Sequence, residues 1–215
     1  MDRINKLCAY LSPCKTFADV GCDHGYCTQY MLKNELCEKA IISDISEKCL
    51  SKAQNLLKEY IKNGKCIPVC CSGLEKIENS VDLVLIAGMG GEEITAILEA
   101  AYIPENFVLQ PMRNVREVRE YLLKNGAEIT RDDVFESGGK FYFVICGKKS
   151  GKICAYTPAE LQFGKGDING ALGGYLRDEL SKKQEYLTRN LSDISRSQIL
   201  EQINLIKGIL NGEIK

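Results

Sequence analysis

The chain has 215 residues, enough for one sizeable domain with an appendage, and its 28 Lys and Arg residues nearly balance its 29 Asp and Glu residues. A net charge of −1 excludes a strongly basic chain, so any contact with RNA has to come from a local basic patch. The 11 cysteines come with no hydrophobic leader and no paired C-x-x-C spacing, which predicts free thiols in the cytoplasm, no metal site and no membrane span.

Strands and helices alternate through the first half of the sequence. Ile4, Leu7 and Leu11 lie on one face of a helix predicted over residues 3–11. Further strands are predicted at 17–20, 40–44, 67–70, 81–86 and 107–109, and further helices at 26–33, 47–62, 92–100 and 113–124. Pro68 favours an edge position for the third of these strands, because proline cannot donate to a neighbouring strand.

The pattern changes after Asn125-Gly126. Two strand-like runs, 129–135 and 141–146, are joined by the short glycine-rich segment 136–140, which predicts an antiparallel hairpin. Five strand–helix units followed by a hairpin predict a doubly wound α/β fold, with a seven-stranded sheet in which one edge strand is reversed.

A glycine-rich segment, 148–166, predicts a linker between two domains, 1–150 and 151–215. Beyond it, leucines and isoleucines at near-heptad spacing predict helices over 169–190 and 193–210, which would form an antiparallel, coiled-coil-like hairpin. Such a hairpin can grip a partner. The alternative is an appendage that stabilises the first domain or forms a dimer.

The stretch from Asp19 to Tyr26 joins the first strand to the next helix. Gly21 and Gly25 let a ligand approach the backbone at the carboxyl end of the strand, where doubly wound sheets bind nucleotides. The stretch has neither the G-x-G-x-x-G dinucleotide fingerprint nor the G-K-[ST] of a phosphate loop. Asp19 and Asp23 would repel a phosphate but suit an amine or a ribose, and S-adenosylmethionine carries both. An ordinary β-turn with two surface acids is the alternative.

Polar or small residues also follow the next strands. Asp44 ends the second strand about twenty residues after the glycine turn, where an acid accepts hydrogen bonds from ribose hydroxyls. Helix capping is the alternative role for Asp44, although Ser46 is already a good N-cap. Ser72-Gly73 follows the third strand, where an adenine edge would lie. The glycine-rich loop 87–91 follows the fourth strand and leaves room for a flat base beside a methyl donor.

Together these motifs resemble the bacterial tRNA (adenine(22)-N1)-methyltransferase family. D-V-G-C-D-H-G-Y at 19–26 is similar to that family's D-I-G-[ST]-D-H-A-Y, and I-A-G-M-G-G at 86–91, L-Q-P at 109–111 and G-K-x-Y at 139–142 match its other motifs. The resemblance covers about residues 3–150 and, in architecture, the terminal hairpin. It implies a Rossmann-like class I methyltransferase fold, S-adenosylmethionine as donor, S-adenosylhomocysteine as product, and methyl transfer to N1 of an adenine in tRNA.

The motifs and the resemblance together imply three groups of site residues. Asp23 and Tyr26 would act in catalysis, Asp23 by accepting from the exocyclic amine or holding the developing charge, and Tyr26 by stacking or donating a hydrogen bond. The cofactor would contact Asp19, Gly21, Cys22, His24, Gly25, Asp44, Ile45, Ser72, Gly73, Ala87, Gly88 and Met89. The tRNA would contact Gly90, Arg113, Arg116, Lys140 and Tyr142. No obligate protein partner is implied.

A basic run is the predicted means of holding tRNA phosphates. Arg113, Arg116 and Arg119 recur at a spacing of three, which puts them roughly on one face of a helix that starts directly after Gln110-Pro111. Solvated charge, offset by neighbouring glutamates, is the alternative.

Two positions depart from the family pattern. Ser72 replaces an acid expected near the adenine, and Met112 replaces the asparagine after L-Q-P, for which Asn114 is a substitute to test. Other readings therefore stay open: a methyltransferase acting on another RNA base, a small molecule or a protein, and a non-catalytic RNA-binding module. The intact strand-end residues, among them Gly21 and Asp44, argue against a module that has lost its cofactor.

Overall fold

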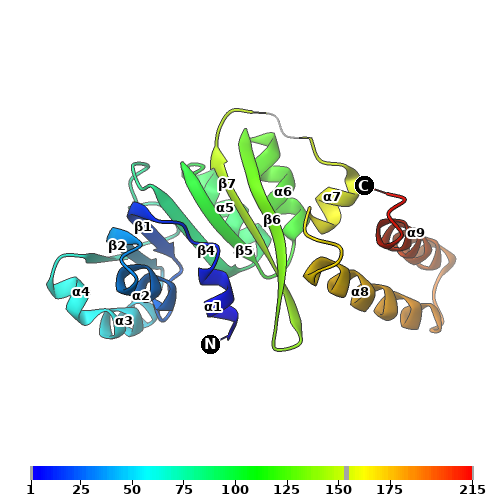
Figure 1. The fold of residues 1–215 in the computed structure, drawn as a ribbon, viewed down its shortest axis with the longest axis horizontal. Coiled ribbons are helices and arrows are strands. Elements are labelled where there is room, and N and C mark those ends of the chain that lie inside the picture. Colours follow the sequence, from blue (N-terminus) through cyan, green and yellow to red (C-terminus); the bar gives the residue numbers. More distant parts are fainter. Residues whose placement is uncertain (1, 153–154, 215) are drawn as a thin grey trace.

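The computed structural model describes residues 2–152 and 155–214, and these contain one mixed sheet with helices on both faces (Figure 1). The sheet has seven strands in the order β3-β2-β1-β4-β5-β7-β6. The strands are β1 (Cys14–Val20), β2 (Cys37–Asp44), β3 (Cys66–Cys70), β4 (Leu83–Met89), β5 (Asn106–Pro111), β6 (Ala127–Ser137) and β7 (Lys140–Lys149). This confirms the doubly wound fold, and β3 lies at an edge as Pro68 predicts.

The chain reverses its direction of winding beside β1. Strand β1 pairs in parallel with both β2 and β4, so Ala18 lies between Ile41 and Val84. Strands β2 and β3 extend the sheet on one side of β1, and β4 and β5 extend it on the other. A crevice forms at such a switch point, outside the carboxyl ends of the strands, and ligands of doubly wound sheets bind there.

The reversed strand does not lie at the edge, which corrects the sequence prediction. Strand β7 runs antiparallel to both of its neighbours, β5 and β6, and β6 is the edge strand. The tight turn at Gly138-Gly139, where φ values of 59° and 71° favour glycine, makes β7 antiparallel to β6. The edge is decided by the next pairing: β7, and not β6, pairs with β5, so the longer of the two hairpin strands forms the outer edge.

Six helices accompany the first five strands in the described part of the chain: α1 (Asp2–Cys8), α2 (Tyr26–Lys33), α3 (Glu47–Leu56), α4 (Lys58–Lys62), α5 (Gly91–Ala100) and α6 (Val115–Lys124). The helix predicted over 47–62 is divided at Leu57, whose φ of −102° and ψ of 15° end α3. Ser46 caps α3 as predicted, because its hydroxyl accepts a hydrogen bond from the Cys49 N–H. Apolar side chains fill both faces of the sheet, with Phe17 and Ile42 in one core and Val20 and Ile86 in the other.

The C-terminal segment ends in the predicted helical hairpin, formed by α8 (Ala171–Leu187) and α9 (Asp193–Leu210) (Figure 1). The expected linker 148–166 contains a further helix, α7 (Pro158–Phe163), which begins at the N-cap Thr157. Residues 153–154, and with them Cys154, lie outside the described residues. No helix in the described ranges is long and apolar enough to cross a membrane.

The hairpin packs on the sheet edge through its own apolar cluster. Leu172 and Leu176 of α8 and Ile206 of α9 are buried against Val134 of β6 and Phe143 of β7. The base of the hairpin is therefore part of the folded core, although the sequence places it in a separate domain.

Candidate functional site

A cavity of about 610 Å³, the first cavity, opens at the carboxyl ends of β1, β2 and β4. Both predicted catalytic residues, Asp23 and Tyr26, line it, and so do all the predicted cofactor residues except Asp19 and Gly25. These lining residues are Gly21, Cys22, His24, Asp44, Ile45, Ser72, Gly73, Ala87, Gly88 and Met89. Motifs far apart in the sequence thus meet at one place, because parallel strands end at the same edge of the sheet.

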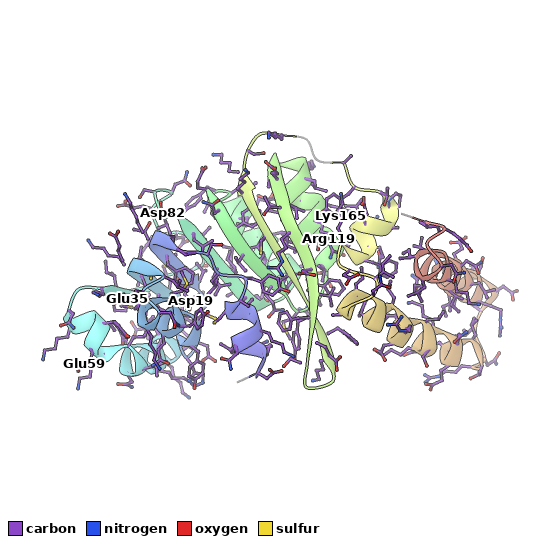
Figure 2. All side chains as sticks on the ribbon, in the orientation of Figure 1. Asp19, Glu35, Glu59, Asp82, Arg119 and Lys165 are labelled. Atoms are coloured by element: carbon purple, nitrogen blue, oxygen red, sulfur yellow. The ribbon has the colours of Figure 1, made fainter. Side chains whose placement is uncertain are left out.

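Asp19 and Gly25 lie behind the wall of the first cavity. Asp19, labelled in Figure 2, is buried at the end of β1 and accepts a 2.8 Å hydrogen bond from the Thr28 hydroxyl. Burial raises the pKa of Asp19 to about 7; the hydrogen bonds from Thr28 act against this rise and the charge of Asp44 adds to it. Gly25 has a φ of 73° and packs against Ala53 of α3. Both residues shape the turn from behind.

Asp44 lies at the end of β2, and its carboxylate has acceptor sites that no protein donor occupies among the described residues. One oxygen accepts from the Ser46 N–H at 2.8 Å, and the other accepts from the Asp23 N–H at 3.4 Å. A carboxylate has about four acceptor sites, so two backbone donors leave sites for the hydroxyls of a ribose. The adjacent Ile45 side chain is exposed and, with Ile97 of α5, gives the first cavity apolar walls suited to an adenine.

Charged and aromatic side chains surround Asp23 at the mouth of the first cavity. The Asp23 carboxylate pairs with Lys52 at 2.8 Å, and His24 Nε2 lies 3.7 Å from it. The hydrogen bond from Lys52 lowers the pKa of Asp23, so this group accepts hydrogen bonds and does not donate them near neutral pH. The rings of His24 and Tyr26 stack with their centroids 5.4 Å apart.

The glycine turn and the loop after β4 pack closely together. Gly21 has a φ of 70°, and a Cβ on it would collide with the methyl group of Met89. Gly90 donates its N–H to Glu93 at the start of α5 and lines neither this cavity nor the next. The tRNA contact of Gly90 stays a prediction; in the structure Gly90 is the N-cap of α5 and lies against Arg113, which lines the next cavity.

A second cavity, of about 710 Å³, lies between the start of α6, the β6–β7 hairpin and α8. The predicted tRNA contacts Arg113, Arg116, Lys140 and Tyr142 all line it. Lys182 of α8 also lines it, which the sequence did not reveal because Lys182 lies far along the chain. Arg116 pairs with Glu120 at 2.7 Å and stays exposed. Asn114 donates to Glu92 at 2.6 Å, so its amide is engaged in holding α6 to α5.

Arg119 does not belong to the basic face, and that prediction is wrong. Its side chain is fully buried and makes two hydrogen bonds to Asp132, of 2.8 Å and 2.9 Å. Arg119, which is labelled in Figure 2, also donates to the carbonyl oxygens of Leu161 and Gln162 on α7. Helical spacing of three covers a wide arc, and the third arginine falls on the face that the C-terminal segment covers.

The sequence also missed several residues of the first cavity. Arg3, Ile4 and Leu7 of α1 form part of its wall, together with Cys27, Cys71, Glu93 and Ala96. The amphipathic pattern of 3–11 predicts the helix, but no local signal says which strand ends that helix will cover.

Comparisons with known proteins agree with this geometry. The family described as "Methyltransferase domain" matches residues 1–145. A candidate tRNA methyltransferase of Mycoplasma pneumoniae is 32% identical over 150 residues, covering 68% of this chain and 69% of that protein. The tRNA (adenine(22)-N(1))-methyltransferase of Bacillus subtilis is 28% identical over 208 residues, covering 94% of this chain and 84% of that protein.

Solved structures share the fold over nearly all of the chain. The structure of M. capricolum TrmK in complex with S-adenosyl-homocysteine superposes with a TM-score of 0.87 at 23% identity, covering 98% of this chain and 97% of that one. The terminal hairpin is thus part of the shared fold. The chain belongs to the methyltransferase domain family, as a relative of the tRNA (adenine(22)-N(1))-methyltransferases.

Proposed function

We propose that the protein transfers a methyl group from S-adenosylmethionine to N1 of adenine 22 in tRNA. One observation carries this function: a cavity built from the strand-end motifs adjoins a second cavity lined by Arg113, Arg116 and Lys140. The first cavity suits a nucleoside with an amino-acid tail, and the second suits a polyanion. The names of the relatives supply the position of the adenine.

The cofactor would lie across the carboxyl ends of β1, β2 and β4. Asp44 would accept from the ribose hydroxyls, and Ile45 and Ile97 would flank the adenine. Gly21 and Gly88, which both have positive φ values, would let the donor approach the backbone. Ser72 can give or accept one uncharged hydrogen bond at the adenine edge.

The chemical step needs positioning more than proton transfer. The N1 lone pair of adenine attacks the methyl carbon while the carbon–sulfur bond breaks and its electron pair returns to sulfur, giving S-adenosylhomocysteine and a cationic N1-methyladenine. Because N1 carries no proton in the neutral base, no general base is required. Ionised Asp23 would stabilise the positive charge that develops on the base, and the stacked His24 and Tyr26 would orient the base.

The target adenine has to leave its stack in the folded tRNA to reach the donor. The second cavity would hold the flanking RNA, with Arg113 and Lys140 on phosphates and Tyr142 beside a base. We place this reaction in the cytoplasm and expect the purified chain to act without a protein partner.

The direct test is methylation by the purified protein with a labelled methyl donor. We expect label in tRNA, recovered as 1-methyladenosine after digestion, and no label in a matched tRNA that carries guanine at position 22. Label in a small molecule or a protein, with none in tRNA, would support the alternative acceptors. Binding of tRNA without any methyl transfer would support the non-catalytic module.

A further inference from the structure

Arg3 of α1 lies where the two cavities meet. Its side chain forms part of the wall of the first cavity. Its guanidinium reaches Met112 at 3.5 Å and lies over the ring of Tyr142, 5.6 Å from the centroid. Met112 and Tyr142 both line the second cavity. The guanidinium therefore lies between the two cavities, within reach of a group bound in either one.

The position of Arg3 is fixed by the way α1 is anchored. Leu7 and Cys8 are buried in the core beneath α1. Asp2 accepts a 2.8 Å hydrogen bond from the Ser137 hydroxyl, and Lys6 donates to the carbonyl oxygen of Glu136 at 2.6 Å. Both anchors hold α1 to the end of the β6–β7 hairpin. Arg3 is thus held on the side of α1 that faces Gly88. A Cβ atom built on Gly88 would lie 3.9 Å from a terminal nitrogen of the Arg3 guanidinium.

Arg3 differs from most other arginines in what it pairs with. Four of the seven other arginines form an ion pair with a carboxylate: Arg116, Arg119, Arg131 and Arg189. Among the described residues, no carboxylate pairs with Arg3, and its guanidinium contacts the Met112 thioether and the Tyr142 ring. A guanidinium carries five donors in a planar fork that fits carboxylate and phosphate oxygens. A half-buried, permanently charged group with free donors beside a ligand cavity is suited to an anionic ligand.

We propose that Arg3 binds the oxyanion of a bound substrate at the junction of the two cavities. Two sources share this chemistry: the carboxylate on the amino-acid tail of S-adenosylmethionine, and a phosphate of the target nucleotide. Both would bring the reacting atoms together, since the oxyanion would be fixed beside Gly88, directly at the predicted methyl-transfer site. The phosphate source rests on the proposed function; the carboxylate source requires only that the donor binds.

The test compares Arg3→Gln and Arg3→Lys with a control, Lys33→Gln, which removes an exposed charge from the last turn of α2, outside both cavities. Calorimetry measures affinity for S-adenosylhomocysteine and for 5′-methylthioadenosine, which lacks the amino-acid tail. Methylation assays measure kcat and the KM for tRNA at several salt concentrations. Thermal unfolding shows whether each variant is folded. Arg3→Lys keeps the positive charge but loses the planar guanidinium, and it replaces Arg3→Gln in the comparison if Arg3→Gln does not fold.

If Arg3 binds the carboxylate, Arg3→Gln weakens S-adenosylhomocysteine binding by about tenfold or more and leaves 5′-methylthioadenosine binding unchanged. If Arg3 binds a phosphate, both affinities stay unchanged, while the KM for tRNA rises by about tenfold or more and the salt dependence loses about one phosphate contact. Arg3→Lys should lie between Arg3→Gln and the wild type in either case.

If folded Arg3→Gln matches the wild type in its affinities for S-adenosylhomocysteine and 5′-methylthioadenosine and in its tRNA kinetics, the proposal is overturned while the proposed function stands. A wild-type protein that binds S-adenosylhomocysteine but methylates no tRNA would instead overturn the proposed function and the phosphate source. The affinities for S-adenosylhomocysteine and 5′-methylthioadenosine would then decide the carboxylate source alone.

Discussion

Asp19 and Asp44 end neighbouring strands, yet they lie in different environments. Asp19 is buried against Thr28 behind the glycine turn, whereas Asp44 lines the first cavity and receives two backbone N–H groups. The same residue type at equivalent strand ends therefore lies in two different environments. We expect Asp44 to contact a ligand, whereas Asp19 supports the turn from within.

Replacing Asp44 tests the cofactor contact directly. Asp44→Ala should lower the affinity for S-adenosylmethionine by about 1.5–3 kcal/mol, because it removes hydrogen bonds to a charged acceptor. Calorimetry measures the effect, and Glu47→Ala, an exposed acid in the first turn of α3, is the matched control. Equal affinities in Asp44→Ala and the wild type would remove Asp44 from the binding site.

Asp19 should make the free energy of unfolding depend on pH. Its pKa is about 7 in the folded protein, against an ordinary value of 3.8, so between about pH 4 and 7 the folded state keeps a proton that the unfolded chain has released. The stability that the protonated Asp19 contributes is complete below that window. It falls as the pH rises across the window and is fully lost once the pH has passed 7. Asp19→Asn should lack this loss. Within the window, the difference in free energy of unfolding between Asp19→Asn and the wild type should therefore shift in favour of the variant by up to about 1.4 kcal/mol per pH unit.

Denaturant unfolding at pH 5, 6, 7 and 8 measures this difference. Thr28→Val provides a second check, because it removes the side-chain hydrogen bond that helps to hold the pKa of Asp19 down. It should therefore extend the upper end of the window to higher pH. Parallel stability curves for Asp19→Asn and the wild type would show that Asp19 does not titrate in this range.

The strand-end residues of the first cavity could be predicted from the sequence, whereas the burial of the Arg119 side chain could not. Asp44 and the loop of Gly88 follow strands that are apolar and parallel, so their convergence is a property of the topology. The burial of Arg119 depends on Asp132, on the next strand, and on the backbone of α7, on a segment that reads as a linker. A local pattern of charges contains no information about such distant partners.

At the scale of elements, a buried polar cluster holds α7 to the sheet. The Arg119 guanidinium joins α6 to Asp132 of β6 and to the last carbonyl groups of α7. The Tyr156 hydroxyl also donates to Asp132, at 3.2 Å. This cluster fixes the segment that leads from the sheet to the hairpin.

Breaking this ion pair from one side should be costly. Arg119→Met should reduce the free energy of unfolding by about 3–5 kcal/mol, because Asp132 is left buried without its partner. The double variant Arg119→Met with Asp132→Leu should recover much of that loss, since it leaves neither charge buried. Denaturant unfolding measures both, with the exposed Arg116→Met as the control; a loss no greater than that of Arg116→Met would contradict the role given to this cluster.

Element order was predictable, but the placement of the last elements was not. Glycines at 138 and 139 announce the hairpin, yet only the pairing of β7 with β5 decides that β6 becomes the edge. Likewise, Leu172 and Leu176 follow a helical spacing, but their burial against Phe143 is a tertiary contact. The division into 1–150 and 151–215 stays a prediction, and the packing at the base of α8 and α9 crosses it.

At the scale of the whole molecule, the distal half of the hairpin extends away from the sheet (Figure 1). No residue from 177 to 202 is buried, whereas the base of the hairpin packs against β6 and β7. Lys183 Nζ donates a 2.6 Å hydrogen bond to Gln202 Oε1, so α8 and α9 lie side by side at this level. The distal half can therefore be removed and closed at this point without opening the core.

Replacing residues 184–201 by a short glycine linker tests whether the distal hairpin holds tRNA. We expect unchanged affinity for S-adenosylmethionine and an unchanged unfolding temperature, with a raised KM for tRNA, because the removed part lies outside the first cavity. Kinetic parameters equal to those of the full chain would restrict tRNA recognition to the second cavity and the hairpin base.

A chain with a net charge of −1 has to hold its polyanionic substrate through a local surface, and the second cavity is the surface that the structure offers. Phosphate contacts release counterions, so the logarithm of affinity falls linearly with the logarithm of salt concentration, by about 0.7–0.9 per contact.

Arg113→Glu with Arg116→Glu should weaken tRNA binding and flatten this slope, while cofactor affinity stays unchanged. Lys62→Glu with Lys65→Glu makes the same change in net charge at the end of α4 and before β3, on exposed residues far along the sheet from α6. If the two double variants weaken binding equally, the effect is one of overall charge; a slope that changes only in the arginine pair places the phosphates at the second cavity.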